Sequence, residues 1–503
     1  MPHLKRLTTC LLALVMVGCT KHAHTAPYLP FAHQESPPES TPTPSPHPYQ
    51  PPTREPDQPL YTPTPDAPNP LPTLRTEEEY YIVKAGDTLK KIGYRYQLLP
   101  KQIAKANGID NPNLIYAGQQ LILPAPTYSE TGPDFKILPD SELVYGPYTV
   151  LFDVESVLQE WGGTITTYEE EVNRETLTGP DIIQLVASNY SVNPRLLIAL
   201  LEHQSGWVTK NKAKDEKFPM GHKEAGYEGL YRQTAWAANQ LNWGYYVWRV
   251  NGIASWQLPD GINVPINTTI NAGTAGVQHF FSKLLPHKKW RQATSEDGLF
   301  ATYQRLFGYP FDFAFQPLLP DDLSQPALQL PFEPGVTWAF TGGPHGGWDT
   351  GSAWAALDFA PPPGNQGCVT SDEWVVAAAD GMVVRSDHGA VVQSLDGDPY
   401  EQTGWSLLYM HIEKRDRVET GTQLQAGDRI GHPSCEGGIS TGTHLHIARR
   451  YNGEWIPADQ DIPFNLGGWI SNGWGIPYEG TLHRDSQTVY AEDRRTDDNL
   501  IRH

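Results

Sequence analysis

The sequence predicts a multidomain α+β chain with a small βααβ module, a mainly helical middle domain and an all-β C-terminal domain. Three observations lead to this prediction. The length of 503 residues corresponds to about three domains of roughly 150 residues each. Apolar residues recur at helical spacing between residues 178 and 318. Between residues 319 and 482 they alternate in short runs separated by turn residues, which is typical of β structure.

The composition excludes two broad classes of function. The chain has 37 Lys and Arg against 57 Asp and Glu, which gives a formal net charge of −20. Nucleic-acid binding needs clustered positive charge, so we expect no nucleic-acid partner. No apolar run reaches the length of about 18 residues that a membrane-spanning helix requires, which excludes a polytopic membrane protein.

Residues 1–18 have the three parts of an export signal. Lys5-Arg6 is the positive region, residues 11–17 are the apolar core, and Gly18 is the small residue before a cut. The string Met16-Val17-Gly18-Cys19 resembles the lipobox of bacterial lipoproteins. The resemblance implies that Cys19 is lipidated, so that an exported protein is anchored to the outer face of the cell membrane and reaches into the wall. The alternative is an ordinary or uncleaved signal peptide.

Residues 19–76 are expected to be a disordered tether. The stretch from 21 to 75 holds 17 of the 46 prolines. Such a segment cannot bury enough apolar surface to fold, and it favours extended polyproline II structure.

The four cysteines predict one disulfide bond. Cys10 leaves with the signal and Cys19 takes the lipid, so Cys368 and Cys435 remain. An even pair in an exported chain indicates a disulfide, with two unpaired thiols as the alternative.

Residues 77–125 show the pattern of the βααβ module. Alternation at residues 81–84 predicts a strand, apolar spacing from Leu89 to Tyr96 predicts a helix, Pro100 opens a second helix, and residues 120–124 form the closing strand. The module resembles the LysM domain at Val83-x-x-Gly86-Asp87-Thr88-Leu89, Asn107-Gly108-Ile109 and Ile115-x-x-Gly118-Gln119-x-Leu121. That family binds chains containing N-acetylglucosamine, so the resemblance implies peptidoglycan as the partner. The alternative is a spacer without a ligand.

Residues 126–177 are expected to be a linker or packing segment, and residues 178–318 a helical domain. The stretch 190–206 resembles the opening of lysozyme-like lytic transglycosylases, in which a Glu before the Ser is the general acid/base. Gln204 stands there and cannot exchange a proton at neutral pH. Glu202 lies about 200° round the helix. We therefore expect a domain that binds or positions glycan without cutting it, with cleavage through Glu202 or another carboxylate as the alternative.

The all-β region, residues 319–482, contains five side chains suited to metal chemistry. His345 lies in a glycine-rich loop, where the backbone can approach a metal closely. Asp358 lies between apolar residues in an expected strand and needs a compensating cation. His411 falls in another expected strand, and the i, i+2 spacing of His444 and His446 points both imidazoles to one side.

The order and spacing of these residues resemble the lysostaphin/LytM-type zinc endopeptidases of bacterial walls, in particular the staphylolysin-like branch. The resemblance implies an antiparallel sheet of the duplicated hybrid motif type. It also implies that His345, Asp358 and His446 bind Zn²⁺ and that His411 and His444 flank the reacting centre. Three protein ligands leave one position for water, as in catalytic zinc sites.

Asp349 is the alternative metal ligand. It follows His345 by four residues, which is the gap of the family's main branch. Because Asp349 lies in a turn and Asp358 in an expected strand, we favour Asp358.

Together these features predict a zinc-dependent endopeptidase that cleaves peptide stems or cross-bridges of peptidoglycan and docks on glycan through LysM. A non-catalytic scaffold or activator is one rival, and the complete set of metal and auxiliary residues opposes it. A glycosidase acting through the middle domain is the other, and Gln204 opposes it. The remaining tail, residues 483–503, is polar and expected to be disordered.

Overall fold

The computed structural model describes residues 48–55, 57–61, 63–363 and 367–503. The expected signal peptide and Cys19 lie outside these residues. Within the described part of the chain, no helix combines the length and hydrophobicity needed to cross a membrane.

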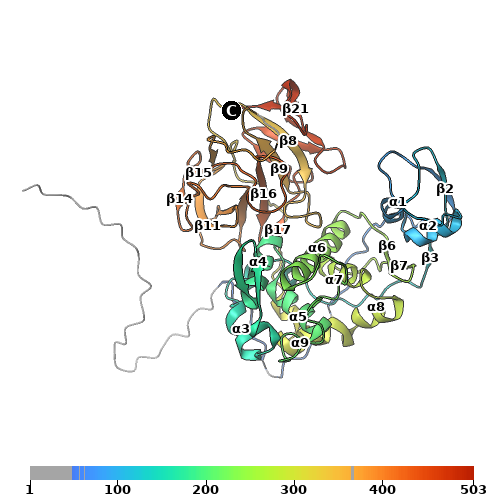
Figure 1. Ribbon diagram of the computed structural model, residues 1–503. Coiled ribbons are helices and arrows are strands. Elements are labelled where there is room, and N and C mark those ends of the chain that lie inside the picture. Colours follow the sequence, from blue (N-terminus) through green and yellow to red (C-terminus); the bar gives the residue numbers. More distant parts are fainter. Residues whose placement is uncertain (1–47, 56, 62, 364–366) are drawn as a thin grey trace, which may run out of the picture. The chain divides into compact units, whose positions relative to one another are not determined.

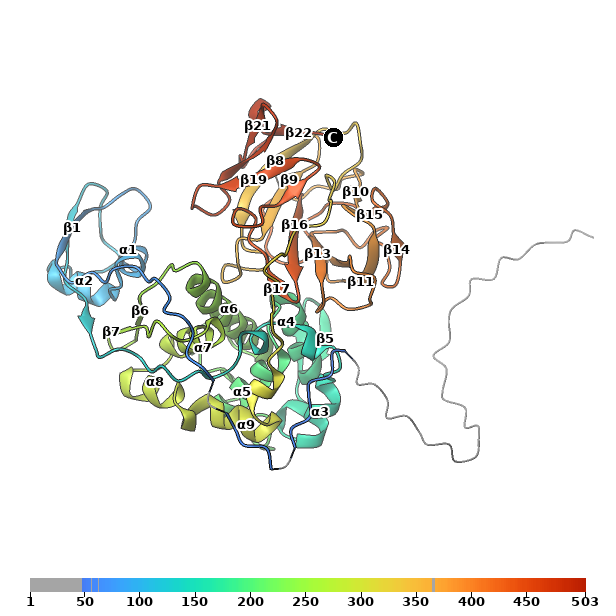
Figure 2. The same cartoon turned by 180° about the vertical axis from the view of Figure 1, so that it is seen from behind.

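The described end of the expected tether, residues 48–76, runs along the helical domain (Figure 2). Arg54 pairs with Asp312 at 2.6 Å, and Asn69 donates a hydrogen bond from Nδ2 to the Trp248 carbonyl at 3.1 Å. In contrast to the expected disordered tether, this part is therefore held by specific polar contacts. These contacts could not be predicted from the composition of the segment, because the partners lie more than 170 residues away in the sequence.

The N-terminal module has the predicted βααβ order, which is confirmed (Figure 1). Strands β1 (Glu79–Ile82) and β2 (Gln120–Leu123) pair antiparallel, and helices α1 (Leu89–Tyr96) and α2 (Pro100–Ala106) lie between them in sequence. Thr88 caps α1 by accepting a hydrogen bond from the Lys91 amide. The module has its own small core, which includes Leu89, Ile92 and Leu121.

The middle of the chain is mainly helical. Its α-helices are α3 (Val154–Trp161), α4 (Gly179–Tyr190), α5 (Pro194–Ser205), α6 (Leu230–Arg249), α7 (Ala272–Ser282), α8 (His287–Ala293) and α9 (Ala301–Phe307). Short strands accompany them: β3 (Thr127–Tyr128), β6 (Ser255–Gln257) and β7 (Ile262–Pro265) form one sheet, and β4 (Glu169–Val172) pairs with β5 (Glu175–Thr178). Proline at the first turn and capping by Thr178 and Asn193 start α4 and α5.

The expected linker, residues 126–177, belongs to this helical domain. It contributes α3 and the β4–β5 hairpin, and its side chains Leu143, Leu158 and Ile165 are fully buried in the same core as α4 and α5. Its apolar residues are too widely spaced along the sequence to show a single period, which explains why it resembles a linker.

The C-terminal domain is built on a nine-stranded antiparallel sheet. Eight strands follow the order β14-β11-β12-β13-β16-β9-β8-β22, with β17 paired to β16. Their bounds are β8 (Trp338–His345), β9 (Ala356–Ala360), β11 (Gly381–Asp387), β12 (Ala390–Ser394), β13 (Trp405–Met410), β14 (Gln423–Leu424), β16 (Leu445–Tyr451), β17 (Glu454–Trp455) and β22 (Leu500–Ile501). Smaller sheets pair β10 (Val375–Val376) with β15 (Arg429–Gly431), and β18 (Asn465–Leu466), β19 (Trp469–Gly473), β20 (Gly480–Arg484) and β21 (Gln487–Tyr490) in order.

The two faces of the large sheet have different neighbours. Leu357, Phe359 and Ile447 face the domain's own core. On the opposite face, Ala356 and Ala448 pack in the same core cluster as the helical domain. Because side chains alternate along a strand, Asp358 and His446 share this second face.

The joint between the helical and β domains is extensively bonded. The Arg385 guanidinium donates to the Asn189 side chain at 2.9 Å, and Arg450 donates to the Ser188 carbonyl at 3.3 Å. Glu401 accepts from both arginines, at 3.1 Å and 2.7 Å. Side chains of the joint are mostly buried, so the two domains share one continuous interior.

The polar tail is ordered. Strand β21 pairs with β20, and β22 pairs with β8 through Leu500 opposite Ala339. Ile501 is buried in the sheet's core, and the Asn499 amide donates to the Phe340 carbonyl. The expectation of disorder was based on the polar composition of residues 483–503. Two apolar residues within this stretch, Leu500 and Ile501, form a short edge strand that holds the tail.

Candidate metal centre

Three adjacent strands bring the predicted metal ligands together. Asp358 on β9 lies directly opposite His446 on β16 and opposite Gly342 on β8, and His345 ends β8 (Figure 2). A Cβ at Gly342 would lie 2.8 Å from the Asp358 carboxylate, so glycine leaves room for that side chain. This contribution of Gly342 is one that sequence reasoning missed.

The three donor atoms match the spacing of a zinc site. His345 Nε2 lies 3.0 Å from His446 Nδ1 and 3.2 Å from Asp358 Oδ1, and His446 Nδ1 lies 3.1 Å from the same oxygen. Bonds of about 2.0 Å to a tetrahedral Zn²⁺ place its ligand atoms about 3.3 Å apart. Among the described residues, this is the cluster whose ligand atoms suit a metal. The set therefore fits zinc in both chemistry and geometry.

Backbone carbonyls set the tautomers of the two histidines. His345 Nδ1 lies 2.8 Å from the Gly343 carbonyl, and His446 Nε2 lies 3.1 Å from the Gly347 carbonyl. A carbonyl only accepts, so each of these nitrogens carries the proton. The other nitrogen of each ring, which faces Asp358, is left with a free lone pair. This second layer of contacts orients metal-binding histidines in proteins.

The carboxylate of Asp358 is held in its charged form. Burial alone would raise its pKa, but His345 and His444 outweigh burial, and the pKa lies well below its usual range. In turn, burial would lower the pKa of His345, but the Asp358 carboxylate reverses this and the pKa is raised. The Asp358 carboxylate is therefore charged, and a divalent cation bound between the three residues would compensate that charge.

His411 and His444 lie beside the cluster. Their ring centroids are 4.4 Å apart, and His444 Nε2 lies 3.7 Å from Asp358 Oδ2. His411 Nδ1 contacts the Glu436 carbonyl at 2.9 Å, and His444 Nδ1 contacts the Gly442 carbonyl at 2.8 Å. Burial lowers the pKa of His411 to about 3, so its imidazole is neutral, and the Nδ1 contact with the Glu436 carbonyl leaves the lone pair on Nε2.

The backbone around both residues differs from the prediction. Strand β13 ends at Met410, and His411 has a φ of 66°, in the left-handed region. Strand β16 begins at Leu445, so His444 precedes it. His411 therefore does not lie in a strand as expected, whereas the imidazoles of His444 and His446 both face Asp358, as their i, i+2 spacing predicts. A non-glycine residue at positive φ is uncommon and is found disproportionately at functional sites.

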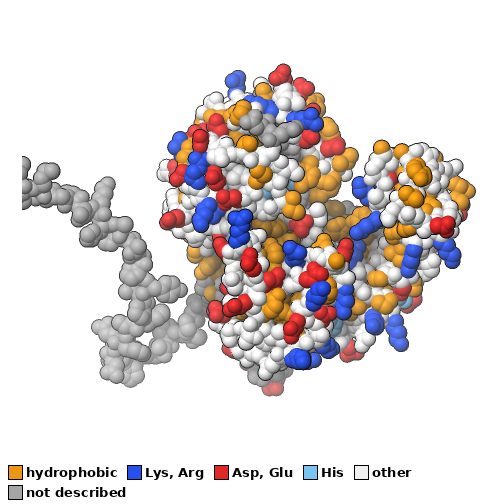
Figure 3. All heavy atoms as spheres, viewed as in Figure 1, with side chains coloured by type: hydrophobic (Ala, Val, Ile, Leu, Met, Phe, Trp, Pro, Cys, Tyr) orange, Lys and Arg blue, Asp and Glu red, His pale blue; other side chains and the backbone are white. Residues whose placement is uncertain are grey.

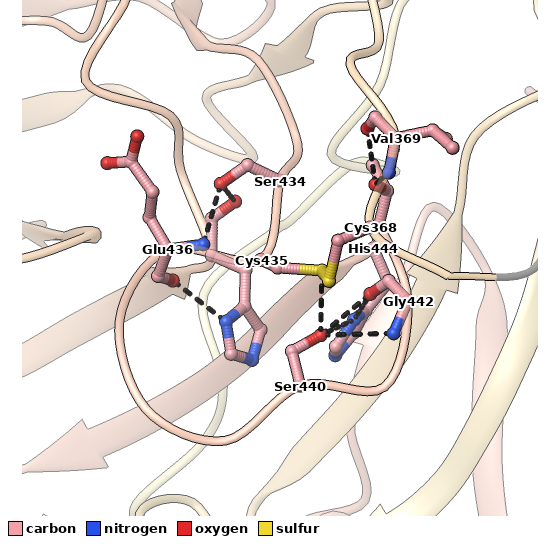
Figure 4. The surroundings of a disulfide bond; sticks show 10 residues. Cys368, Val369, Ser434, Cys435, Glu436, Ser440, Gly442 and His444 are labelled. Carbon is pink, nitrogen blue, oxygen red and sulfur yellow. Dashed lines mark hydrogen bonds between the residues drawn. A yellow bond between two sulfur atoms is a disulfide. The ribbon is translucent and has the colours of Figure 1, made fainter.

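A disulfide bond holds the loop that carries His444. Cys368 and Cys435 form the predicted bond (Figure 4). On one side of it, Ser434 donates to the His411 carbonyl at 2.9 Å; on the other, Ser440 Oγ lies 3.3 Å from His444 Nδ1. The bond thereby ties the 434–444 loop, which contacts both auxiliary histidines, to the segment at Cys368.

Asp349 lies outside the metal cluster. Its Oδ1 accepts from the Thr350 amide at 2.6 Å, and its Oδ2 accepts from the Tyr190 hydroxyl at 3.2 Å. Its φ is 58°, which belongs to a tight turn. The geometry therefore favours Asp358 over Asp349 as the ligand.

A cavity of about 690 Å³ opens over the metal cluster and has walls from both domains. The β domain supplies the five predicted residues, together with Trp348, Asp349, Ile439 and Tyr478. The helical domain supplies Leu185, Asn189 and Tyr190 from α4 and Tyr231 from α6. The participation of α4 and α6 carries no local signal in the sequence, because it depends on how the two domains join.

The two candidate groups of the middle domain are engaged elsewhere. Glu202 accepts hydrogen bonds from the Val208 and Thr209 amides and pairs with Arg305 at 3.1 Å. Gln204 donates to the Met220 carbonyl at 2.9 Å. Both side chains stabilise the chain that follows α5.

Three segments of the chain match known families. Residues 81–124 match the LysM domain, residues 136–319 match "LasA, N-terminal domain", and residues 353–457 match "Peptidase family M23". The chain thus carries LysM, LasA N-terminal and M23 peptidase domains. Asp358, His411, His444 and His446 lie within the last match, and His345 lies eight residues before it. The match to the LasA N-terminal domain includes residues 190–206, the stretch that resembles lytic transglycosylases.

Individual relatives agree with these matches. Protease LasA of Pseudomonas aeruginosa is 26% identical over 289 residues, which are 53% of this chain and 65% of that protein. Beta-lytic metalloendopeptidase of Achromobacter lyticus is 28% identical over 164 residues, 31% of this chain and 39% of that protein. The chain thus spans less than two thirds of these relatives. The structure of the M23 metalloprotease pseudoalterin covers 34% of this chain and 99% of its own, with 23% identity and a TM-score of 0.27.

Proposed function

We propose that the chain is a zinc-dependent peptidoglycan endopeptidase that cleaves peptide stems or cross-bridges. The observation that carries the proposal is the buried triad of His345, Asp358 and His446. The ligand atoms of the triad have the spacing of a tetrahedral site, and backbone carbonyls fix the tautomers of its two histidines. The match to an M23 peptidase domain and the names of the relatives support the same class of activity.

The side chains divide the chemistry between them. His345, Asp358 and His446 would hold Zn²⁺, which when bound lowers the pKa of water and polarises a carbonyl. His411 lines the same cavity, and because its Nδ1 contacts the Glu436 carbonyl, its Nε2 is the nitrogen placed to accept a proton from the attacking water. His444 directs its Nε2 toward Asp358, and in its protonated form it is placed to donate to the developing oxyanion or the leaving amine. Both roles need the imidazoles close to the triad, as the structure has them.

The remaining domains supply docking. The LysM domain would bind the glycan strands and concentrate the peptidase on its substrate. We also propose that the chain is exported and held to the outer face of the membrane by a lipid on Cys19, on the basis of the lipobox-like string. Labelling cells with a radioactive or clickable fatty acid tests the anchor, since Cys19→Ala would abolish the label.

Product analysis tests the main proposal. The purified protein is incubated with intact peptidoglycan, with and without a zinc chelator, and the products are analysed by mass spectrometry. New peptide amines that disappear with chelator and return with added zinc are expected. New sugar ends that ignore the chelator would instead place the chemistry in the middle domain. No products from a zinc-loaded protein would favour a scaffold or activator.

A further inference from the structure

The cavity over the metal cluster has an uneven distribution of charge. Among the described residues, no lysine or arginine lines it. Apart from the triad residue Asp358, its carboxylate is that of Asp349. His388 also lines the cavity, but its imidazole pairs with Glu175 at 3.1 Å and Asp387 at 3.5 Å, which compensate its charge when it is protonated. A bound Zn²⁺ would compensate Asp358, so the carboxylate of Asp349, away from the metal position, is the feature of the lining that favours a positively charged group.

Asp349 is placed to contact a ligand. It is an exposed residue, and each of its oxygens has one partner, so each keeps lone-pair capacity. Its neighbours are aromatic: Tyr190 donates to it, Trp348 precedes it, and the Tyr190 and Trp348 rings are 6.3 Å apart. Tyr231 lines the same cavity as Asp349, and burial, with the negative charge of Asp349, raises the pKa of Tyr231.

Two of these aromatic residues belong to the helical domain, and the joint keeps them in place. Tyr190 is 8% exposed, and its carbonyl accepts from Asn242 Nδ2 at 2.7 Å and from Trp455 Nε1 at 3.3 Å. The Trp455 amide also donates to the Tyr246 hydroxyl at 2.9 Å. A wall fixed by buried bonds of this kind is part of the site and not a loosely attached cover.

We propose that Asp349, with the aromatic side chains of Trp348, Tyr190 and Tyr231, binds an ammonium group of the substrate peptide beside the scissile bond. The inference rests on the proposed endopeptidase function and names its substrate class as a peptide with a free amine, from a diamino-acid side chain or an N-terminal residue. A carboxylate and ring faces together select an ammonium over an amide. The helical domain is then a specificity element of the peptidase.

Chemical acetylation of the substrate tests this proposal. Peptidoglycan is prepared in two forms, native and with its free amines acetylated by acetic anhydride, and cleavage of both by the full chain is measured. The variant is Asp349→Asn, because asparagine tolerates the φ of 58° and keeps oxygen and shape while removing the charge. Asp372→Asn is the matched control, since Asp372 is 90% exposed and pairs with Arg415 outside the cavity.

The wild-type protein is expected to cleave the native form on the order of tenfold faster than the acetylated form. Asp349→Asn should bring this ratio close to one, whereas Asp372→Asn should preserve it. Equal wild-type rates on both forms would overturn the proposal. So would a variant that slows both forms equally, because Asp349 would then be structural. Absence of chelator-sensitive products from either form would instead refute the endopeptidase function itself.

Tyr231→Ala separates a substrate-binding wall from an inhibitory one. Loss of a binding ring should slow cleavage of the native form severalfold and reduce the ratio between the two forms. Faster cleavage of both forms by this variant would show that α6 obstructs the site, which would overturn the role assigned here to the helical domain.

Discussion

Replacing Glu401 with glutamine is expected to weaken the joint between the helical and β domains. The Glu401 carboxylate lies between Arg385 and Arg450, and the side chains of the three residues are 9%, 12% and 1% exposed. Both arginines also bond to the end of α4, through Asn189 and the Ser188 carbonyl. The substitution keeps the shape of the side chain but removes the negative charge between two buried guanidinium groups: Arg385 keeps Asp387 at 3.4 Å, whereas Arg450 keeps its bond to the neutral Ser188 carbonyl.

The magnitude follows from this burial. Breaking a buried ion pair by removing one partner costs about 3–5 kcal/mol, because the remaining charge stays desolvated. An exposed pair contributes only about 0–1 kcal/mol. We therefore expect Glu401→Gln to lower the free energy of unfolding by about 3 kcal/mol or more, and Asp372→Asn, at an exposed pair, by less than about 1 kcal/mol.

The dependence on pH gives a second signature. Burial would raise the pKa of Glu401, but Arg385 and Arg450 outweigh it, and the pKa is lowered. A lowered folded-state pKa means that the stabilisation is complete above the unfolded-state value of about 4.3 and is lost as the pH falls through the folded-state value. The difference in stability between wild type and variant should therefore be full at pH 7 and shrink in acid.

Urea unfolding followed by tryptophan fluorescence measures these quantities, since the midpoint shift multiplied by the slope gives the change in free energy. A Glu401→Gln shift no larger than that of Asp372→Asn at pH 7 would refute the reasoning. So would a difference that stays constant between pH 7 and pH 3.

Three further predictions concern the site. Asp358→Asn should lose zinc on dialysis while Asp349→Asn retains it, as measured by elemental analysis; the opposite result would make Asp349 the ligand. His411→Ala and His444→Ala should keep zinc but lower kcat by about 10²–10⁴-fold, with the exposed His483→Ala as the control; unchanged rates would remove both residues from the chemistry. Replacing Cys368 and Cys435 with alanine should destabilise the β domain by about 4 kcal/mol for a loop closed over 67 residues; a thermal unfolding midpoint equal to that of the wild type would contradict this expectation.

Local patterns in the sequence were sufficient for several features of the structure. The βααβ module follows from helical and alternating periods within 45 residues. Asp358 and His446 fall on one sheet face because strand alternation fixes the direction of each side chain. The resemblance to lysostaphin/LytM-type endopeptidases implied the set of His345, Asp358 and His446, which the strands β8, β9 and β16 bring together.

Features that depend on contacts between residues far apart along the chain could not be predicted from local patterns in the sequence. The positive φ of His411 arises where β13 gives way to a loop held by Ser434 and Glu436. Residues 48–76 and 483–503 have compositions typical of disorder but gain partners far along the chain. The cavity wall from α4 and α6 depends on the joint, whose partners are separated by about 200 residues or more. No single stretch of sequence contains that information.

Charged side chains of both signs lie on the molecular surface. On the face shown in Figure 3, basic and acidic side chains are interspersed.

The last strand of the chain has a consequence for how the protein behaves at high concentration. Strand β22 occupies the outer edge of β8, the strand that ends at His345. A bare strand edge is a template for pairing with another chain and a route to aggregation. A protein shortened to residue 482, where the peptidase domain was expected to end, would expose that edge at Trp338 and Ala339, in the strand that carries His345 at its other end. The final residues therefore cover an edge of the sheet, and we expect their removal to lower the solubility of the protein.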